Sequence, residues 1–251
     1  MRYPTPTIAI AAMRYYDIHK GDNLPKIREF IHRAKRRGAD IICFPESCIT
    51  KKGALLLTHH YVKEIQAECK KHSIWAIVTE DIMLNDERYN ISMLVDREGK
   101  IRGKYKKINL YGDRTLPGHK VRVFDTDFGK IGIVICWDIT FPKLFDAMKK
   151  KGAQIVFCPA NWSYDIQAHT CGHKKKEIRL LRSILLARAH ENVFFVALVN
   201  PLTDDEAQVS YSAISCPHHI IKELIDKEGV ITAKVNLKEV HKFRKFYSKE
   251  D

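Results

Sequence analysis

Apolar residues along this chain follow two distinct spacings. In one segment they recur every three or four positions, as on one face of a helix, at Leu24, Ile27, Phe30, Ile31 and Ala34. Pro25 suits a first helical turn, and Gly38 follows two cationic residues, so we expect a helix between them. The next run, 41–44, is apolar at every position, which is typical of a strand covered on both faces.

This helix-to-strand pattern occurs twice. Residues 36–45 and 150–159 each contain a basic helix end, Gly-Ala, one polar residue, four apolar residues and Pro. The interval from Gly to Pro is seven positions in both copies. Two similar units predict a fold with two related sheets.

The remaining elements follow from the same spacings. A helix should end near His72 and another should cover 174–191. Strands are expected at 8–12, 74–79, 89–95, 101–105, 121–126, 131–136, 193–199, 211–216 and 230–235. Because no Pro-, Gly- or Ser-rich linker divides the chain, we predict one α/β domain over residues 1–251.

Composition and charge narrow the class of protein. The chain is 45% hydrophobic, which excludes a disordered chain. It carries 43 Lys and Arg against 30 Asp and Glu, a net charge of +13, so a basic nucleic-acid-binding protein is one alternative. The basic runs at 149–151 and 174–176 lie at helix ends without interleaved aromatic residues, which favours solvated helix faces over a nucleic-acid partner.

The apolar runs and the cysteines bear on location. The longest unbroken apolar run, 193–199, has seven residues, whereas a membrane span needs about 20. The first residues lack the layout of a signal peptide. Seven scattered cysteines, an odd number, do not form a disulfide framework, so we predict reduced thiols in a cytoplasmic protein without membrane contact.

Three segments contain candidate chemistry. Glu46 follows the apolar strand at 41–44, at the edge where α/β proteins usually bind ligands. The second segment, 103–110, contains the adjacent cations Lys106 and Lys107. In the third, 129–138, Cys136 ends an apolar strand and precedes a helix.

These segments resemble the nitrilase superfamily of carbon–nitrogen hydrolases. The resemblance spans nearly the whole chain, and its most specific part is the segment around Cys136, Gly-Lys-Ile-Gly-Ile-Val-Ile-Cys-Trp-Asp. It implies a Glu–Lys–Cys catalytic set in that chain order, which falls on Glu46, Lys107 and Cys136. It also implies a four-layer α-β-β-α sandwich with two facing mixed β-sheets, a homodimer or higher homo-oligomer, and no cofactor.

The physical roles of these residue types agree with the resemblance. Lys107 and the positive end of the following helix would favour the reactive thiolate of Cys136. Glu46 would accept protons, first from the thiol and later from water. The Lys107 ammonium and the backbone N–H of Trp137 would stabilise the oxyanion formed on attack.

The family's register distinguishes the two adjacent lysines. The pattern Tyr-x-Lys-x-His-Leu places the catalytic lysine at Lys107 and an asparagine, Asn109, at the position of the family's histidine. On an extended segment Lys106 and Lys107 point to opposite faces, so only one of them can enter a single pocket.

Three departures from the family pattern weaken a substrate assignment. The family often has a second Glu before Pro117-Gly118, and here Asp113 is the only carboxylate in that connection. Lys143 stands where a Glu often follows Phe-Pro, and no Gly precedes Ser212. Because of these changes, an alternative interpretation is a nitrilase-like protein with weak or altered catalysis, which acts in binding or regulation.

Aromatic residues and possible metal ligands complete the candidates. Asn161 and Trp162 follow the second Pro-ended strand, and we predict that Trp162 lines the substrate pocket with Trp137; the alternative is a packing aromatic. Possible ligand groups lack an evident fourth member, so we expect no metal site. These groups are His169, Cys171 and His173, and Cys216, His218 and His219.

The sequence thus predicts a hydrolase of non-peptide carbon–nitrogen bonds. The expected substrate is a small amide or N-carbamoyl compound, and the expected intermediate is a cysteine thioester.

Overall fold

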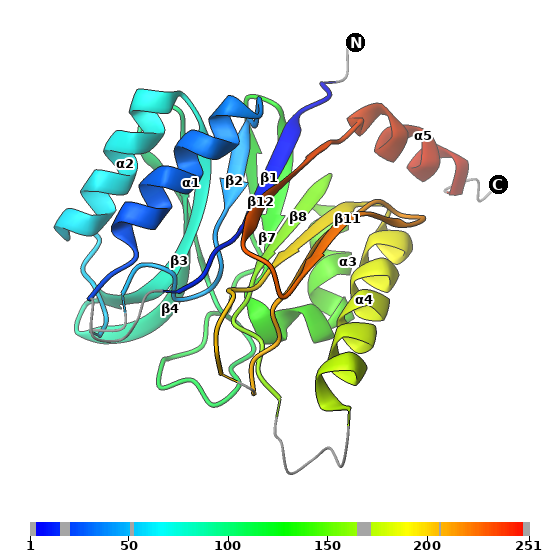
Figure 1. Ribbon diagram of the computed structural model, residues 1–251. Coiled ribbons are helices and arrows are strands. Elements are labelled where there is room, and N and C mark those ends of the chain that lie inside the picture. The colour runs from blue at the N-terminus through cyan, green and yellow to red at the C-terminus, as the bar shows by residue number, and fades with distance from the viewer. Residues whose placement is uncertain (1–3, 16–20, 51–52, 165–171, 206, 248–251) are drawn as a thin grey trace.

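The chain forms two sheets that face each other between helices (Figure 1). The computed structural model describes residues 4–15, 21–50, 53–164, 172–205 and 207–247. The first six-stranded sheet has the order β12 (Gly229–Lys234), β1 (Thr7–Ala12), β2 (Ile41–Cys43), β3 (Trp75–Leu84), β4 (Glu87–Val95) and β5 (Ile101–Lys106). The second has the order β11 (Ile220–Ile225), β10 (Tyr211–Ser215), β9 (Phe195–Val199), β8 (Ile155–Pro159), β7 (Gly129–Ile133) and β6 (Val123–Thr126).

Helices cover the outer faces of both sheets. In Figure 1, α1 (Leu24–Arg36) and α2 (His60–His72) lie outside the first sheet, and α3 (Pro142–Lys150) and α4 (His173–Asn192) lie outside the second. A final helix, α5 (Leu237–Tyr247), follows β12. Both sheets are mixed, since parallel pairs such as β1–β2 and β7–β8 adjoin antiparallel ones. The four-layer α-β-β-α sandwich predicted from the sequence is therefore confirmed.

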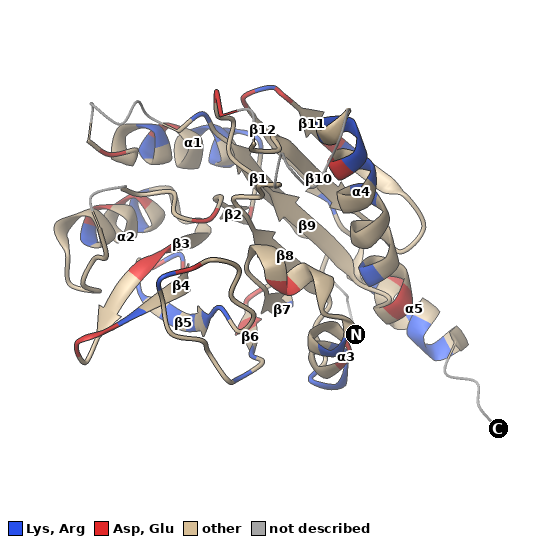
Figure 2. Cartoon of the chain, turned by 90° about the horizontal axis from the view of Figure 1, so that it is seen from below, with Lys and Arg blue, Asp and Glu red and all other residues tan. Residues whose placement is uncertain are grey.

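The alternation of residues along β1 explains the layering. Ile8 and Ile10 lie in the core between the sheets, which also contains Phe157 of β8. Ala9 and Ala11 point the other way, into the core shared with α1 and α2. In Figure 2, charged residues occupy the helices and the sheet margins, and strands β8 and β9 carry none.

The two helix-to-strand units lie in different sheets, as the repeat predicted. Gly38 and Gly152 end α1 and α3 with φ angles of 75° and 83°, a conformation that glycine adopts without strain. The strands that follow are β2 in the first sheet and β8 in the second. Beyond these strands, the Glu46 N–H donates a hydrogen bond of 3.2 Å to the Ala160 carbonyl, so the two strand ends meet.

Some elements differ from the sequence expectation. Strand β7 ends at Ile133, and Cys136 begins a 3-10 helix, Cys136–Thr140. Strand β3 extends to Leu84, where it pairs with β4. Strand β11 and helix α5 were not expected, because charged residues interrupt their apolar spacing. Among the described residues, no helix is long and apolar enough to cross a membrane.

Candidate active site

Cys136 lies at a sharp turn between β7 and the 3-10 helix. Its backbone has a φ angle of 47°, in the left-handed region that residues with a side chain rarely adopt. The preceding Val134 N–H donates to the Phe157 carbonyl of β8 at 3.0 Å, which holds the chain before the turn. Strained backbone of this kind is frequent at functional sites.

Asp138 fixes the turn from within. Its buried carboxylate accepts hydrogen bonds from the Ile135 N–H at 3.1 Å and from the Tyr105 hydroxyl at 2.7 Å. It also accepts the backbone and side-chain N–H groups of Asn109, at 2.7 and 2.9 Å. The turn that carries Cys136 is thereby tied to the segment that carries Lys107.

Glu46, Lys107 and Asp113 form a buried ion-pair group. The Lys107 Nζ lies 2.9 Å from Glu46 Oε1, and 3.0 Å from Asp113 Oδ2. Glu46 and Lys107 are only 5% and 2% exposed, respectively. Asp113, shorter than the family's usual Glu by one methylene, still reaches the ammonium.

Cys136 joins this group. Its side chain lines the same cavity as Glu46 and Lys107, and the charges of both residues act on the pKa of its thiol. The Asn161 N–H donates a hydrogen bond of 3.2 Å to Glu46 Oε2. One thiol, one carboxylate and one ammonium from three distant parts of the chain therefore lie within a single cluster.

The charges of the cluster set the protonation states of its members. Burial raises the pKa of Glu46, although the Lys107 ammonium opposes this shift. Burial disfavours the Lys107 ammonium, but the carboxylates of Glu46 and Asp113 outweigh that effect and raise its pKa. Burial and the Glu46 charge raise the pKa of the Cys136 thiol, and Lys107 offsets them only in part. The resting site therefore favours the thiol, while Lys107 acts toward the thiolate, the direction expected from the sequence.

The cluster opens into a small cavity of about 140 Å³. Polar and aromatic side chains line it, namely Glu46, Ser47, Lys107, Tyr111, Asp113, Cys136, Trp137, Asn161, Trp162 and Ser163. A cavity of this size accommodates a small molecule and little more. All seven candidate site residues from the sequence line this cavity.

Aromatic rings in contact form one wall of the cavity. The ring centroids of Trp137 and Trp162 lie 5.5 Å apart, and those of Tyr111 and Trp137 lie 4.7 Å apart. The Trp162 indole N–H donates to buried Glu177 of α4 at 3.0 Å. This bond holds the Trp162 ring in its orientation.

Lys106 lies on the other face of β5. Its Nζ is 3.1 Å from the centroid of the Tyr89 ring, outside the cavity at Cys136. The opposite orientations of Lys106 and Lys107 agree with the alternation expected of an extended segment.

The possible metal ligands do not form a cluster among the described residues. His169 and Cys171 lie outside them, whereas His173 begins α4. Cys216 Sγ lies 3.2 Å from His219 Nδ1, a pair rather than a ligand set. The six described cysteines are free thiols, all buried.

Sequence reasoning missed several residues that shape the site. The Tyr111 ring packs against Trp137, and its position two residues before Asp113 was the available signal. Asp138 lies two residues after Cys136, yet its partners come from β5 and the loop after it. Glu177 had no local signal, because only the packing of α4 brings it to Trp162.

The sandwich and its buried cysteine cluster define a class that comparisons with known proteins identify. The family model for carbon-nitrogen hydrolases matches residues 7–245. The human omega-amidase NIT2 is 26% identical over 251 aligned residues, covering 90% of this chain and 87% of that protein. The 2-oxoglutaramate amidase of Bacillus subtilis is 27% identical, covering 89% of each chain.

A solved structure shows the same fold. Nit3 of Saccharomyces cerevisiae, a nitrilase-superfamily member, superposes with a TM-score of 0.84 at 20% identity, covering 99% of this chain and 96% of that chain. The chain belongs to the carbon–nitrogen hydrolase family, the nitrilase superfamily that its sequence resembles.

Proposed function

We propose that this protein hydrolyses the carbon–nitrogen bond of a small amide through a thioester on Cys136. The observation that carries the proposal is the cluster of Cys136, Glu46 and Lys107 at the wall of one cavity. The amidase activities named for two relatives, each aligned over most of the chain, support an amide substrate.

The first half of the reaction forms the thioester. The Cys136 sulfur attacks the amide carbon while its proton moves to Glu46, whose raised pKa suits a base that must hold that proton. The carbonyl electron pair moves onto oxygen, which the Lys107 ammonium and the Trp137 N–H stabilise. When the carbon–nitrogen bond breaks, Glu46 returns the proton to nitrogen and ammonia or an amine leaves.

The second half releases the acid. Water attacks the thioester carbon as Glu46 accepts one of its protons. The carbon–sulfur bond then breaks, the proton returns to sulfur and the carboxylic acid leaves. This sequence needs no metal and restores the thiol.

The relatives' names suggest a substrate class. One relative is named an omega-amidase and the other a 2-oxoglutaramate amidase, and these names point to a terminal amide. A cavity of about 140 Å³ suits such a compound. N-carbamoyl compounds present the same kind of carbonyl and remain within the proposal.

A panel of small amides and N-carbamoyl compounds tests the proposal, with ammonia release as the readout. Cys136→Ala should abolish turnover, and Cys136→Ser should retain less than about one per cent, because a hydroxyl is a far weaker nucleophile here. Intact mass spectrometry should detect an acyl adduct on the wild type alone. Substrate binding without ammonia release or adduct would favour the nitrilase-like binding protein instead.

Two further properties follow from the resemblance and the composition. We predict a homodimer or higher homo-oligomer, which sedimentation velocity would show as a mass of at least twice 29.1 kDa. We also predict a cytoplasmic location, in keeping with the free thiols of the described cysteines.

A further inference from the structure

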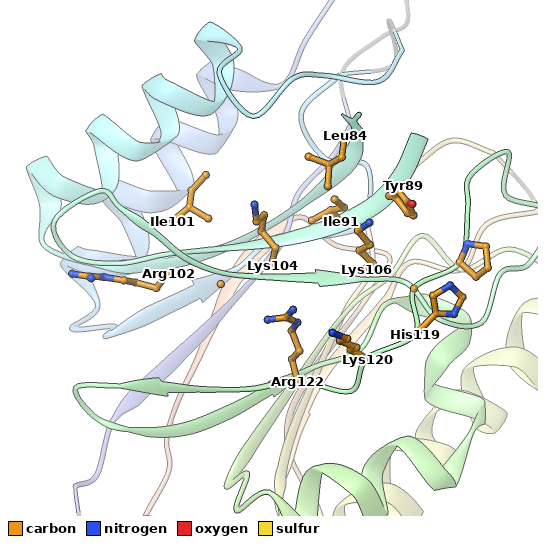
Figure 3. Close-up of a pocket in the computed structure, with 13 residues that line it drawn as sticks. Leu84, Tyr89, Ile91, Ile101, Arg102, Lys104, Lys106, His119, Lys120 and Arg122 are labelled. Carbon is orange, nitrogen blue, oxygen red and sulfur yellow. The ribbon is translucent and has the colours of Figure 1, made fainter. Parts of the chain in front are cut away.

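A second cavity, of about 490 Å³, lies beside β5, at the edge of the first sheet (Figure 3). Figure 3 shows that its side chains come from β3, β4 and β5 and from the segment 117–122. Among the described residues that line it, none is Asp or Glu. Its charged and titratable members are Arg102, Lys104, Lys106, His119, Lys120 and Arg122.

Three of these cations have no carboxylate partner within the described part of the chain. They are Lys104, Lys120 and Arg122. By contrast, Arg102 pairs with Asp96 and Glu98, and Lys106 rests on the Tyr89 ring. Unpaired cations around one concave surface attract an anion more strongly than scattered surface charges do.

The electrostatic surroundings of Lys106 also favour an anion in this cavity. Burial and the neighbouring Lys104 lower its pKa, although Glu87 opposes them. Glu87 itself accepts a hydrogen bond of 2.5 Å from the Tyr89 hydroxyl. A bound anion would relieve the repulsion between the lysines.

The cavity also has an apolar wall. Leu84, Ile91 and Ile101 form it beside the Tyr89 ring. Close backbone packing shapes the floor, since a Cβ at Gly103 would lie 2.3 Å from the Phe124 ring and one at Gly118 would lie 2.5 Å from the Lys106 carbonyl. An inorganic anion would leave these apolar surfaces uncovered.

We propose that this cavity binds a nucleoside phosphate, with the phosphates on Lys104, Lys120 and Arg122 and the base against the apolar wall. The volume falls within the roughly 300–1,000 Å³ of small-molecule sites. Phosphates and a flat base together match the two kinds of lining side chain. A single concave cavity of this volume favours a mononucleotide over a nucleic-acid strand, which binds along an extended groove.

This site lies on the opposite face of the chain from the catalytic cluster and is separate from it. Lys106 and Lys107 point to opposite faces, and the two cavities share no lining residue in the described part of the chain. The Gly118 N–H donates to the Lys107 carbonyl at 2.7 Å, so the backbone joins the two sites. Because neither site contains a group of the other, binding can be measured without reference to turnover.

Isothermal titration calorimetry with ATP, adenosine and tripolyphosphate tests the proposal on the full chain. ATP should bind with one site per chain, and tripolyphosphate and adenosine should each bind at least about tenfold more weakly. In the triple variant Lys104→Gln/Lys120→Gln/Arg122→Gln, ATP affinity should fall by at least about tenfold. The triple variant Lys149→Gln/Lys150→Gln/Lys151→Gln removes the same charge at the end of α3 and should bind ATP like the wild type.

Several results would overturn the proposal. If ATP affinity fell equally in both triple variants, ATP would be attracted by the net charge of the protein alone. Tripolyphosphate binding as tightly as ATP would leave no role for the apolar wall. Tighter binding of a single-stranded oligoadenylate than of ATP would indicate a nucleic-acid surface. Absence of ATP binding in a wild-type protein with normal thermal unfolding would also refute it.

Discussion

The orientations of two adjacent residues, Lys106 and Lys107, determine which lysine lies in the candidate site. Lys107 lies 2.9 Å from Glu46, whereas Lys106 lies over the Tyr89 ring on the other face. Lys107→Ala should lower kcat/KM by at least about a thousandfold, because it removes the cation from the oxyanion. Lys106→Ala is the matched control and should keep most of the activity. The reverse order in an ammonia-release assay would reassign the role to Lys106.

Asp113 tests how the second carboxylate tunes the cluster. Its charge helps to raise the pKa of Glu46, so Asp113→Asn should lower that pKa. Glu46 then ionises at lower pH, and the acidic limb of the kcat/KM profile should move to lower pH. If the Asp113→Asn profile has the same apparent pKa values as the wild type and only a lower kcat/KM, Asp113 would only position Lys107.

At the scale of elements, one buried network ties β5 to the Cys136 turn. The Tyr105 hydroxyl donates to Asp138 at 2.7 Å, where no water can replace it. Tyr105→Phe should therefore cost about 1–2 kcal/mol in the free energy of unfolding. It should also lower kcat, because the turn loses a fixed partner.

A second tyrosine supplies the control for this change. The Tyr89 hydroxyl donates to Glu87 near the surface, so Tyr89→Phe should change stability by less than about 0.5 kcal/mol. Urea unfolding measures both variants. Equal losses of stability would contradict a special role for the Tyr105–Asp138 bond.

Elements were predictable where their pattern is local. Helices α1 and α4 and the β4–β5 hairpin match the expected ranges within two residues. Strand β11 and helix α5 were missed because their polar residues, such as Glu223 and Lys242, obscure the spacing. Their contacts with β10 and with Pro4 arise from tertiary packing.

For the molecule as a whole, buried Glu80 links stability to pH. Its carboxylate accepts the N–H groups of Ile49 and Thr50, at 2.8 and 3.0 Å, and so holds the loop after Glu46. Burial raises its pKa to about 8, above the roughly 4.3 of an unfolded chain. The folded state therefore binds this proton more tightly than the unfolded state, and its stabilising effect is lost as pH rises from about 4 through about 8.

Glu80→Gln should flatten this dependence, since the amide stays neutral. Urea unfolding between pH 5 and 8 should show wild-type stability falling by on the order of a few kcal/mol, and falling less in the variant. Glu29→Gln removes an exposed carboxylate and serves as the control. Parallel slopes for the wild type and Glu80→Gln would contradict the assignment of this proton to Glu80.

The sequence alone determined the order of most elements, the family, and the candidates Glu46, Lys107 and Cys136. Periodicity, helix ends and motifs are properties of neighbouring residues, so they can be recognised before folding. The tertiary structure decided that Asp113 reaches Lys107, that Glu177 holds Trp162, and that burial with Glu46 keeps Cys136 as a thiol. It also formed the cavity beside β5. These features depend on which distant side chains the facing sheets bring together and exclude from water, and no local spacing encodes that.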